Sequence, residues 1–349
     1  MVLLFYNNNG DFMKINRNLK SAVPYLSVVL ALHIIGFGFL FFGGWQHPVL
    51  LGMGLIAYTL GLRHAFDADH IAAIDNTVRK LLEQRQNPSG VGFYFSLGHS
   101  SVVFLMAVLL GVAVNWAKAH LTTFQTTGGL IGTLVSGFFL ILIGILNLII
   151  LIQLVQLFKK VRSEHITSLE LNELLDSRGL IMRFVRPLFK FITKSWHVYP
   201  LGFLFGLGFD TASEVSLLAL SAGAAQQTLP LLGILSLPIL FAAGMSLLDT
   251  LDGVVMTEAY HWAFDTPIRK IYYNITITSV SVIAALFIGV LEILQLIGEK
   301  QHWTTGFGGW IAQLDIGWLG YGLVIVFILA WLISMTIWKV FDIEGKGVK

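Results

Sequence analysis

The chain has 349 residues, of which 56% are hydrophobic and only 12% are charged, and its formal net charge is +2. Soluble domains usually carry about 25% charged residues, so this sequence lacks the polar surface that a water-soluble protein needs. The absence of cysteine excludes disulfides, thiolate metal sites and thiol redox chemistry. The small net charge is no indication of nucleic-acid binding, and we expect no nucleic-acid partner. Composition therefore predicts a membrane protein.

Apolar stretches of about 20 residues recur along the chain, which is the length needed to cross a hydrocarbon core about 30 Å thick. The first, residues 23–42, is too long for the apolar part of a signal peptide and lacks a small-residue cleavage site, so we expect it to be retained. We predict an all-α polytopic membrane protein with eight transmembrane helices, over residues 23–42, 50–78, 91–116, 130–157, 199–223, 230–256, 274–298 and 317–339.

The distribution of Lys and Arg predicts how these helices are oriented. Nineteen of the 22 basic residues fall on one side of the predicted membrane, two fall on the other, and Arg63 lies within a span. Because cytoplasmic loops are enriched in Lys and Arg, we expect both termini in the cytoplasm. We expect the membrane itself to be the inner membrane of a bacterial cell. The chain then divides into a cytoplasmic tail (1–22), helices one to four (23–158), a cytoplasmic loop (159–198), helices five to eight (199–339) and a cytoplasmic tail (340–349).

Within the predicted loop, residues 180–193 alternate apolar and basic residues at helical spacing around Pro187. Such a pattern is typical of an amphipathic helix on an anionic lipid surface. A solvated linker with some local helix fits the same residues equally well.

Two sets of three predicted helices resemble each other in sequence. A Gly-Leu pair followed by Phe-Asp begins at Gly61 in the second span and at Gly206 in the fifth. Residues 95–100 likewise correspond to 241–246, and residues 142–147 to 287–292, at offsets between 143 and 146 residues. On the predicted orientation the two sets cross the membrane in opposite directions. We therefore predict an inverted repeat of spans two to four and five to seven, a transporter architecture with its binding site near the membrane midplane.

Ionisable side chains lie inside the predicted spans, although each charge near the bilayer centre costs at least about 2.5–3.5 kcal/mol by insertion scales. One arginine, Arg63, cannot neutralise six carboxylates, so the balancing positive charge must come from protons or from a bound cation. The candidate site residues are His64, Asp67, Asp69, His70, His99, Asp210, Glu214, Asp249 and Asp252, and His33 in the first span could approach them.

The densest group is RHAFDADH at residues 63–70. At about 100° per residue of a continuous helix, His64, Asp67 and His70 fall within an arc of about 120°. Asp69 lies outside that arc, so it could join the same ion only if the helix is distorted, or it could orient a histidine. Imidazole with carboxylate suits Ni²⁺, Co²⁺, Zn²⁺ or Cu²⁺ better than Mg²⁺ or Ca²⁺. The alternative is a polar network that ties helices together.

Three further spans carry polar motifs beside glycines. The third span contains His99, the fifth contains Asp210 and Glu214 one turn apart, and the sixth contains Asp249 and Asp252. Glycine lets helices approach closely, and the neighbouring Ser and Thr can hydrogen-bond across them. These groups could orient the histidines of the second span, or they could be ordinary interhelical contacts.

The histidine motif, HisxxxxAspHis within RHAFDADHI, resembles the signature of the nickel/cobalt transporter (NiCoT) family of secondary metal permeases. Three other segments match signatures of that family, namely FSLGHSSVV at 95–103, LGFDTASEV at 207–215 and GMSLLDTLD at 244–252. The resemblance implies uptake of Ni²⁺ and/or Co²⁺ across the cytoplasmic membrane, with transport dependent on His64, Asp69 and His70. It implies no prosthetic cofactor, no required ATPase subunit and no enzymatic activity, and the sequence contains no GxxxxGK[ST] phosphate-binding loop.

Three other functions use the same kind of residues. Efflux of the same metals is one, although related exporters often carry a His-rich cytoplasmic segment and the predicted loop holds only His165 and His197. An intramembrane metalloenzyme is another, but no HExxH motif is present. A carrier of an organic substrate would have no clear use for the histidine cluster. Ni²⁺ and Co²⁺ cannot be distinguished from sequence, because both take nitrogen and oxygen ligands.

Overall fold

The computed structural model describes residues 13–112, 114–164, 192–207, 212–227, 229–264, 267–314 and 317–341. These residues form helices joined by short turns and include no strand, which confirms the prediction of an all-α chain. The helices are α1 (Met13–Gly44), α2 (Pro48–His64), α3 (Ala68–Glu83), α4 (Val91–Val112), α5 (Val114–Glu164), η1 (Ser195–His197), α8 (Val198–Gly206), α9 (Ala212–Gln226), α10 (Leu231–Phe264), α11 (Pro267–Lys300), α12 (Gly306–Ala312) and α13 (Gly317–Phe341).

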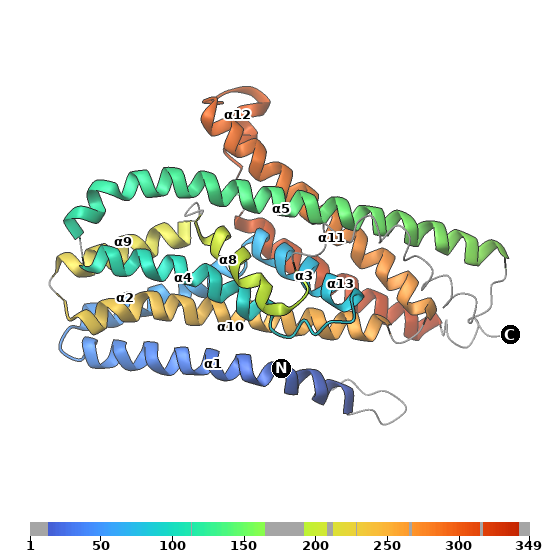
Figure 1. Ribbon diagram of the computed structural model, residues 1–349, viewed down its shortest axis with the longest axis horizontal. Coiled ribbons are helices and arrows are strands. Elements are labelled where there is room, and N and C mark those ends of the chain that lie inside the picture. Colours follow the sequence, from blue (N-terminus) through green and yellow to red (C-terminus); the bar gives the residue numbers. More distant parts are fainter. Residues whose placement is uncertain are drawn as a thin grey trace.

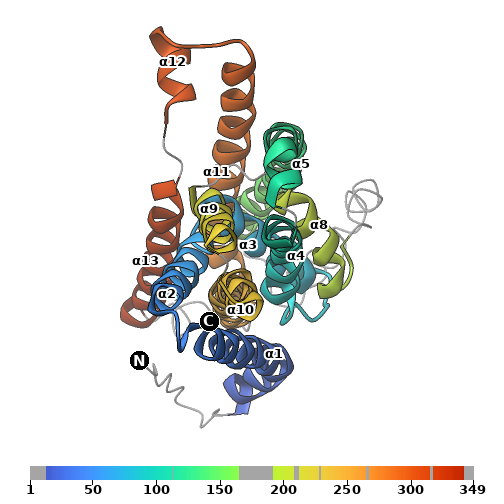
Figure 2. The same ribbon diagram turned by 90° about the vertical axis from the view of Figure 1, so that its left-hand side faces the viewer.

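Helix α10 lies at the centre of the bundle. It runs between α1 on one side and α5 on the other (Figure 1), and it packs against α1, α2, α3 and α4. The end-on view shows the same arrangement, with α12 and the end of α11 projecting away from the bundle (Figure 2). The centre of the fold is thus one long helix surrounded by helices that the sequence predicts as membrane spans.

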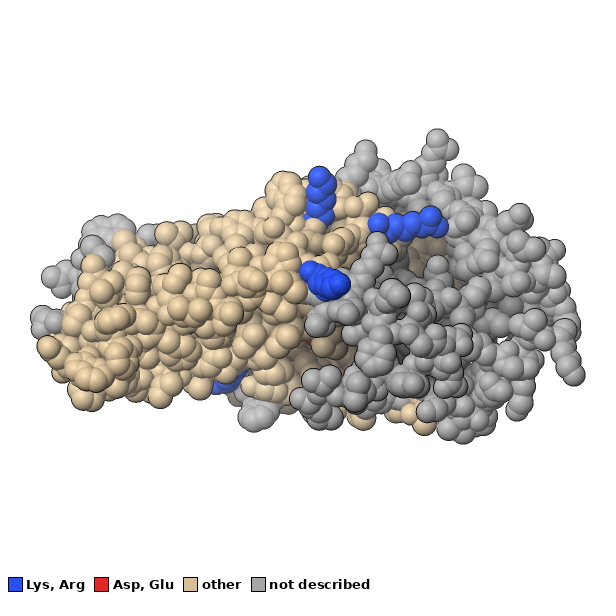
Figure 3. Space-filling view, turned by 90° about the horizontal axis from the view of Figure 1, so that it is seen from below, with Lys and Arg blue, Asp and Glu red and all other residues tan. Residues whose placement is uncertain are grey.

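Five of the described helices contain segments long and apolar enough to cross a membrane. The segments are Lys20–Gly44, Val91–Leu109, Gly129–Gln156, Leu231–Tyr260 and Ile275–Lys300, and the bent pair Pro48–His64 with Ala68–Leu82 makes a sixth. A broad area at the left-hand end of the view from below carries no Lys, Arg, Asp or Glu (Figure 3), and many large hydrophobic side chains of these helices are exposed. The chain is a multi-pass membrane protein, as its composition predicts.

The predicted second span, residues 50–78, is not one continuous helix. Helix α2 ends at His64, α3 begins at Ala68, and the two are bent by 53°. Asp67 has an extended backbone and precedes the first turn of α3, the position where Asp is a favoured helix cap. Its side chain makes no capping hydrogen bond, however, because its carboxylate faces His64 instead. The arc calculated for a continuous helix therefore does not apply here.

Helix α13 packs directly on this break. A Cβ added to Gly320 would overlap the carbonyl oxygen of Phe66, so only glycine permits the approach. The rings of Phe66 and Tyr321 stack beside it, with centroids 4.9 Å apart. The break is therefore covered by protein, as non-helical backbone at membrane depth requires.

Helix α3 continues five residues past the predicted end of the second span, to Glu83. Arg79 and Lys80, which the sequence places in a cytoplasmic loop, lie in this extension and are only 0% and 5% exposed. By contrast Arg63, counted as the arginine inside a span, has an exposed side chain. The predicted fifth span, residues 199–223, is described as two helices, α8 and α9.

Glycines bring two helix pairs into close contact, α2 with α10 and α4 with α8. A Cβ at Gly61 would overlap the carbonyl oxygen of Phe241, and a Cβ at Gly202 would overlap that of Phe95. A second contact of the same kind joins each pair, Gly244 with the Tyr58 carbonyl and Gly98 with the Tyr199 carbonyl. These contacts hold α2, α10, α4 and α8 close enough for their polar side chains to meet.

Candidate metal centre

Three histidines from three helices converge at the break between α2 and α3. His64 is the last residue of α2, His70 lies in the first turn of α3, and His99 lies in α4. Their ring centroids are 4.7 to 4.8 Å apart, and their side chains are 1%, 0% and 3% exposed. One ligand nitrogen from each histidine lies within 4.8 Å of the other two. The helix break, rather than a shared helix face, is what brings His64 and His70 together.

The Nε2 atoms of His64 and His99 lie 2.9 Å apart. Two imidazole nitrogens bound at right angles to one ion, each at the zinc–histidine distance of about 2.0–2.1 Å, would be about 2.9 Å apart. The Nε2 atom of His99 also lies 2.9 Å from Oε1 of Glu214, which is in the first turn of α9 and is 1% exposed. Nε2 of His99 is therefore in contact with a ring nitrogen and a carboxylate oxygen, each at the spacing of neighbouring metal ligands.

Two of the three rings have a carboxylate next to their Nδ1 atom. Nδ1 of His64 lies 2.8 Å from Oδ2 of Asp67, and Nδ1 of His70 is hydrogen-bonded to Oδ2 of Asp249 at 3.2 Å. An N–H on Nδ1 that faces a carboxylate leaves the lone pair on Nε2, the tautomer that binds metal. Among the residues that the structure describes, Nε2 of His70 is buried without a hydrogen-bond partner. It is thus a ready donor atom.

Two phenylalanines close the sides of the centre. The ring of Phe95 lies 4.8 Å from that of His70 at 90°, and the ring of Phe241 lies 5.5 Å from that of His64. Both phenylalanines are fully buried. Apolar walls exclude water, so electrostatic attraction between an ion and the carboxylates is stronger here than in solution.

The remaining candidate residues lie further out or outside the described ranges. Asp69 is partly buried in the first turn of α3, and Asp252 is partly buried one turn along α10 from Asp249. His33 on α1 is hydrogen-bonded to the hydroxyl of Tyr58 at 3.2 Å and does not join the three-histidine group. Asp210 falls within residues 208–211, which lie outside the described residues.

A second buried polar network, which sequence reasoning missed, surrounds Asp75 on α3. The hydroxyl of Tyr260 on α10 donates to Oδ1 of Asp75 at 2.8 Å, and that of Ser281 on α11 donates to Oδ2 at 2.5 Å. Arg79, one turn along α3, interacts electrostatically with the same carboxylate. Asp75 falls within the predicted second span, so the criterion that selected Asp67 and Asp69 would also have found it.

Comparison with known proteins agrees with this picture. Residues 50–337 match the NicO family, described as high-affinity nickel-transport protein. The chain is 67% identical to the nickel transporter NixA of Staphylococcus aureus over 93% of this chain and 96% of the relative. It is 53% identical to a high-affinity nickel-transport protein NixA of Helicobacter pylori over 92% and 98% of the two chains.

A more distant relative is named for cobalt. The cobalt transport protein NhlF of Rhodococcus rhodochrous is 39% identical over 90% of this chain and 90% of its own. No solved structure matches the chain. The resemblance carried by the four sequence motifs is thus confirmed over nearly the whole length. This chain belongs to the NicO family of high-affinity nickel-transport proteins.

Proposed function

We propose that this protein takes up Ni²⁺ and/or Co²⁺ across the cytoplasmic membrane as a secondary, ATP-independent permease and has no enzymatic role. The observation that carries the proposal is the convergence of buried His64, His70 and His99 with carboxylates around them. The printed names of the relatives, which are nickel and cobalt transporters, support the same class of substrate.

The ligands of the ion in transit are the Nε2 atoms of the three histidines and Oε1 of Glu214. This set of nitrogen and oxygen donors suits a borderline divalent metal. Asp67 and Asp249, behind His64 and His70, orient these rings and offset the charge of the ion. The carboxyl end of α2 also contributes, because the negative end of its dipole lies at His64.

The other candidate residues lie along the route to and from this centre. His33 with Tyr58 lies on the outer approach, because Tyr58 precedes His64 on α2 by six residues, or about 9 Å at about 1.5 Å per residue. Asp69, Asp210 and Asp252 supply further negative charge along the route. A chain of such sites lowers the barrier to moving a divalent ion through a low-dielectric interior.

The proposed topology has eight spans with both termini in the cytoplasm. The two halves form an inverted repeat, for which the glycine contacts give support. Gly61 against Phe241 and Gly202 against Phe95 are symmetric contacts if Gly61 corresponds to Gly202, which is one helical turn before the Gly206 that the sequence motif pairs with Gly61. Helix breaks at the centre of inverted repeats form the binding sites of many secondary transporters, and rocking of the halves alternates access.

The membrane potential is sufficient to drive uptake without ATP. A divalent cation gains about 4.6 kcal/mol per 100 mV on moving to a negative interior, twice the value for a single charge. The driving force therefore does not require an ATPase subunit.

Uptake of ⁶³Ni by cells that express the His64→Ala variant tests the proposal. We expect uptake at the level of cells without the protein, while the amount of variant in the membrane equals that of the wild type. The matched control is His302→Asn, which changes an exposed histidine and suits its positive φ of 54°. Normal uptake by His64→Ala would refute the ligand assignment.

The same cells distinguish uptake from efflux. Expression of the wild-type protein should make them more sensitive to nickel in the medium if the metal enters, and more resistant if the metal leaves. Increased resistance would overturn the proposed direction without affecting the metal centre. Competition between unlabelled Ni²⁺ and Co²⁺ in the uptake assay determines the preferred ion.

A further inference from the structure

A buried pair of asparagines joins α3 to α5. Asn76 on α3 is 1% exposed, and Asn147 on α5 is 4% exposed. The side-chain N–H of Asn147 donates to Oδ1 of Asn76. Nδ2 of Asn76 in turn donates to the backbone carbonyl of Ala72 at 2.6 Å. Asn147 ends residues 142–147, a repeated segment of the sequence that supplies no group to the metal centre. The pair is therefore a specific polar contact between two helices, away from the ligand atoms.

Helix α3 carries His70, but its position does not follow from that of α2. The chain breaks at residues 65–67, so the place of His64 at the end of α2 does not dictate where His70 points. A shift of α3 by one residue would turn it by about 100° and move it by about 1.5 Å. Either displacement would carry Nε2 of His70 away from the group that it forms with His64 and His99. Contacts with the neighbouring helices must therefore fix both the rotation and the depth of α3.

Polar contacts attach α3 to its neighbours at two heights. In the first turn, Nδ1 of His70 is hydrogen-bonded to Asp249 on α10. About 9 Å further along, Asp75 is bonded to α10 and α11, and Asn76 is bonded to Asn147 on α5. The side chains of His70 and Asn76 point about 120° apart on a helix, because six residues separate them. Attachments on different faces and at different heights fix rotation as well as depth.

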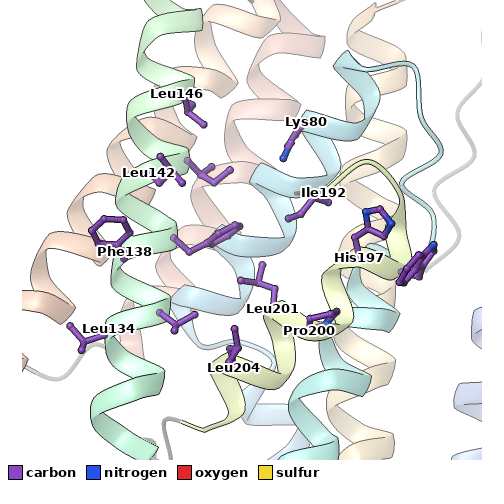
Figure 4. Close-up of a pocket in the computed structure, with 14 residues that line it drawn as sticks. Lys80, Leu134, Phe138, Leu142, Leu146, Ile192, His197, Pro200, Leu201 and Leu204 are labelled. Atoms are coloured by element: carbon purple, nitrogen blue, oxygen red, sulfur yellow. The ribbon is translucent and has the colours of Figure 1, made fainter. Parts of the chain in front are cut away.

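Apolar packing is interrupted where α5 passes the end of α3. An apolar groove of about 810 Å³ lies there, with Leu142 and Leu146 of α5 on one wall and Leu201 of α8 on the other (Figure 4). Side chains that line such a space lack the interdigitation that close packing provides, so they leave neighbouring helices some freedom to slide. A directional hydrogen bond between buried side chains specifies one position where apolar contacts do not.

We propose that Asn76 and Asn147 are positioning residues of the metal centre, and that their hydrogen bond holds α3 in the rotation and depth that bring His70 to the ion. Any other register would leave their amide groups buried and unpaired. Single buried asparagines specify the register of coiled coils for the same reason. Neither residue belongs to the three-histidine group. The inference rests on the proposed metal centre and adds to it how α3 is aligned.

Leucine, which is similar to asparagine in size but cannot hydrogen-bond, is the replacement that tests the pair. Asn76→Leu and Asn147→Leu each leave a buried polar atom of the other residue unpaired, so both should lower the thermal unfolding temperature of the purified protein in detergent. The double variant with both changes leaves no unpaired amide at this contact. It should therefore be more stable than either single variant.

Metal binding separates positioning from stability. We expect the double variant to bind Ni²⁺ about tenfold more weakly than the wild type in calorimetric titration, the lower end of the effect of losing a contact that supports a ligand. Its Co²⁺ complex should show an altered ligand-field absorption spectrum, because that spectrum reports the coordination geometry. A purely structural role of the pair would leave affinity and spectrum unchanged in a variant that regains stability.

The matched control is Ser136→Ala on α5. It removes a buried hydroxyl that has no hydrogen-bond partner among the residues that the structure describes, and it should match the wild type in unfolding temperature, affinity and spectrum. Wild-type affinity and spectrum in any leucine variant that folds would overturn the inference. Failure of the wild type itself to bind Ni²⁺ or Co²⁺ would instead overturn the proposed metal centre, so the two failures are distinguishable.

Discussion

His64 and His99 share a short contact between their Nε2 atoms, 2.9 Å apart, across the interface of α2 and α4. Neither ring is more than 3% exposed, so one proton between the two nitrogens satisfies both in the absence of an ion. Glu214 approaches the same nitrogen of His99 with its carboxylate oxygen. A divalent ion among these three atoms would take the place of that proton.

Binding of Ni²⁺ to the purified protein should therefore release protons. Metal ligands must be deprotonated, so affinity falls as the pH is lowered and protons leave as the metal binds. Isothermal titration calorimetry in buffers of different ionisation enthalpy measures the number released, and we expect about one per ion. His99→Ala should abolish the proton release together with tight binding. A binding heat independent of the buffer would contradict this account.

Asp249 should strengthen metal binding without touching the ion. Its carboxylate accepts a hydrogen bond from Nδ1 of His70 and so aims Nε2 of that ring at the centre. Loss of such a partner typically lowers metal affinity by about 10–100-fold. We expect this reduction for Asp249→Ala in the same calorimetric titration. Asp249→Asn should show a smaller reduction, because its amide oxygen still accepts the hydrogen bond from His70.

Ser27→Ala, which changes an exposed side chain on α1, is the control and should leave the affinity for Ni²⁺ unchanged. Equal affinity of Asp249→Ala and the wild type would show that His70 needs no such support.

The sequence predicts much of this fold because the spans are long and apolar. They can be located along the chain without knowing how the helices pack. Six of the spans meet the length and hydropathy of a membrane crossing when the bent pair counts as one. The helix break at residues 65–67 could not be predicted in the same way. No proline or glycine marks it, and its backbone is covered by α13, whose Gly320 packs on the carbonyl of Phe66. Such tertiary support is invisible to a reading of local propensity.

The candidate site was predictable in composition but not in geometry. His64, His70 and His99 were all identified from charge inside apolar helices, and the calculated helix face put Asp67 on the same side as the first two. The structure has Asp67 at Nδ1 of the His64 ring, and a role for Asp67 as a metal ligand stays a prediction. The pairing of His70 with Asp249, 179 residues away, depends on the contact of α3 with α10. No spacing along the chain encodes that contact.

Gly61 is predicted to tolerate no side chain. A Cβ there would overlap the backbone carbonyl of Phe241, which a helix cannot move without shifting α2 from α10. Overpacking of this kind costs about 1–3 kcal/mol. We expect Gly61→Ala to lower the thermal unfolding temperature of the purified protein, and Gly202→Ala to lower it similarly because its contact is equivalent.

Gly52 is the matched control on the same helix, since a Cβ added to it would have no other atom within 4 Å. Replacement of an unconstrained glycine by alanine stabilises a helix by about 0.4–1 kcal/mol, so Gly52→Ala should raise the unfolding temperature or leave it unchanged. A loss of stability at Gly52 as large as at Gly61 would mean that general helix effects, not the contact with α10, set the result.

The network at Asp75 should contribute more to stability than to metal affinity. Tyr260→Phe removes one hydrogen bond to the carboxylate of Asp75 and should reduce the free energy of unfolding by about 0.5–1.5 kcal/mol. Asp75→Ala removes the acceptor of both the Tyr260 and the Ser281 hydrogen bonds, so it should lower the free energy of unfolding more than Tyr260→Phe does. Thermal unfolding of both variants in detergent shows which of the two loses more stability.

Calorimetric titration of Tyr260→Phe with Ni²⁺ provides the second readout. We expect wild-type affinity, because Tyr260 is hydrogen-bonded to Asp75 and lies outside the three-histidine group. A large loss of affinity with unchanged stability would instead make Asp75 part of the metal route.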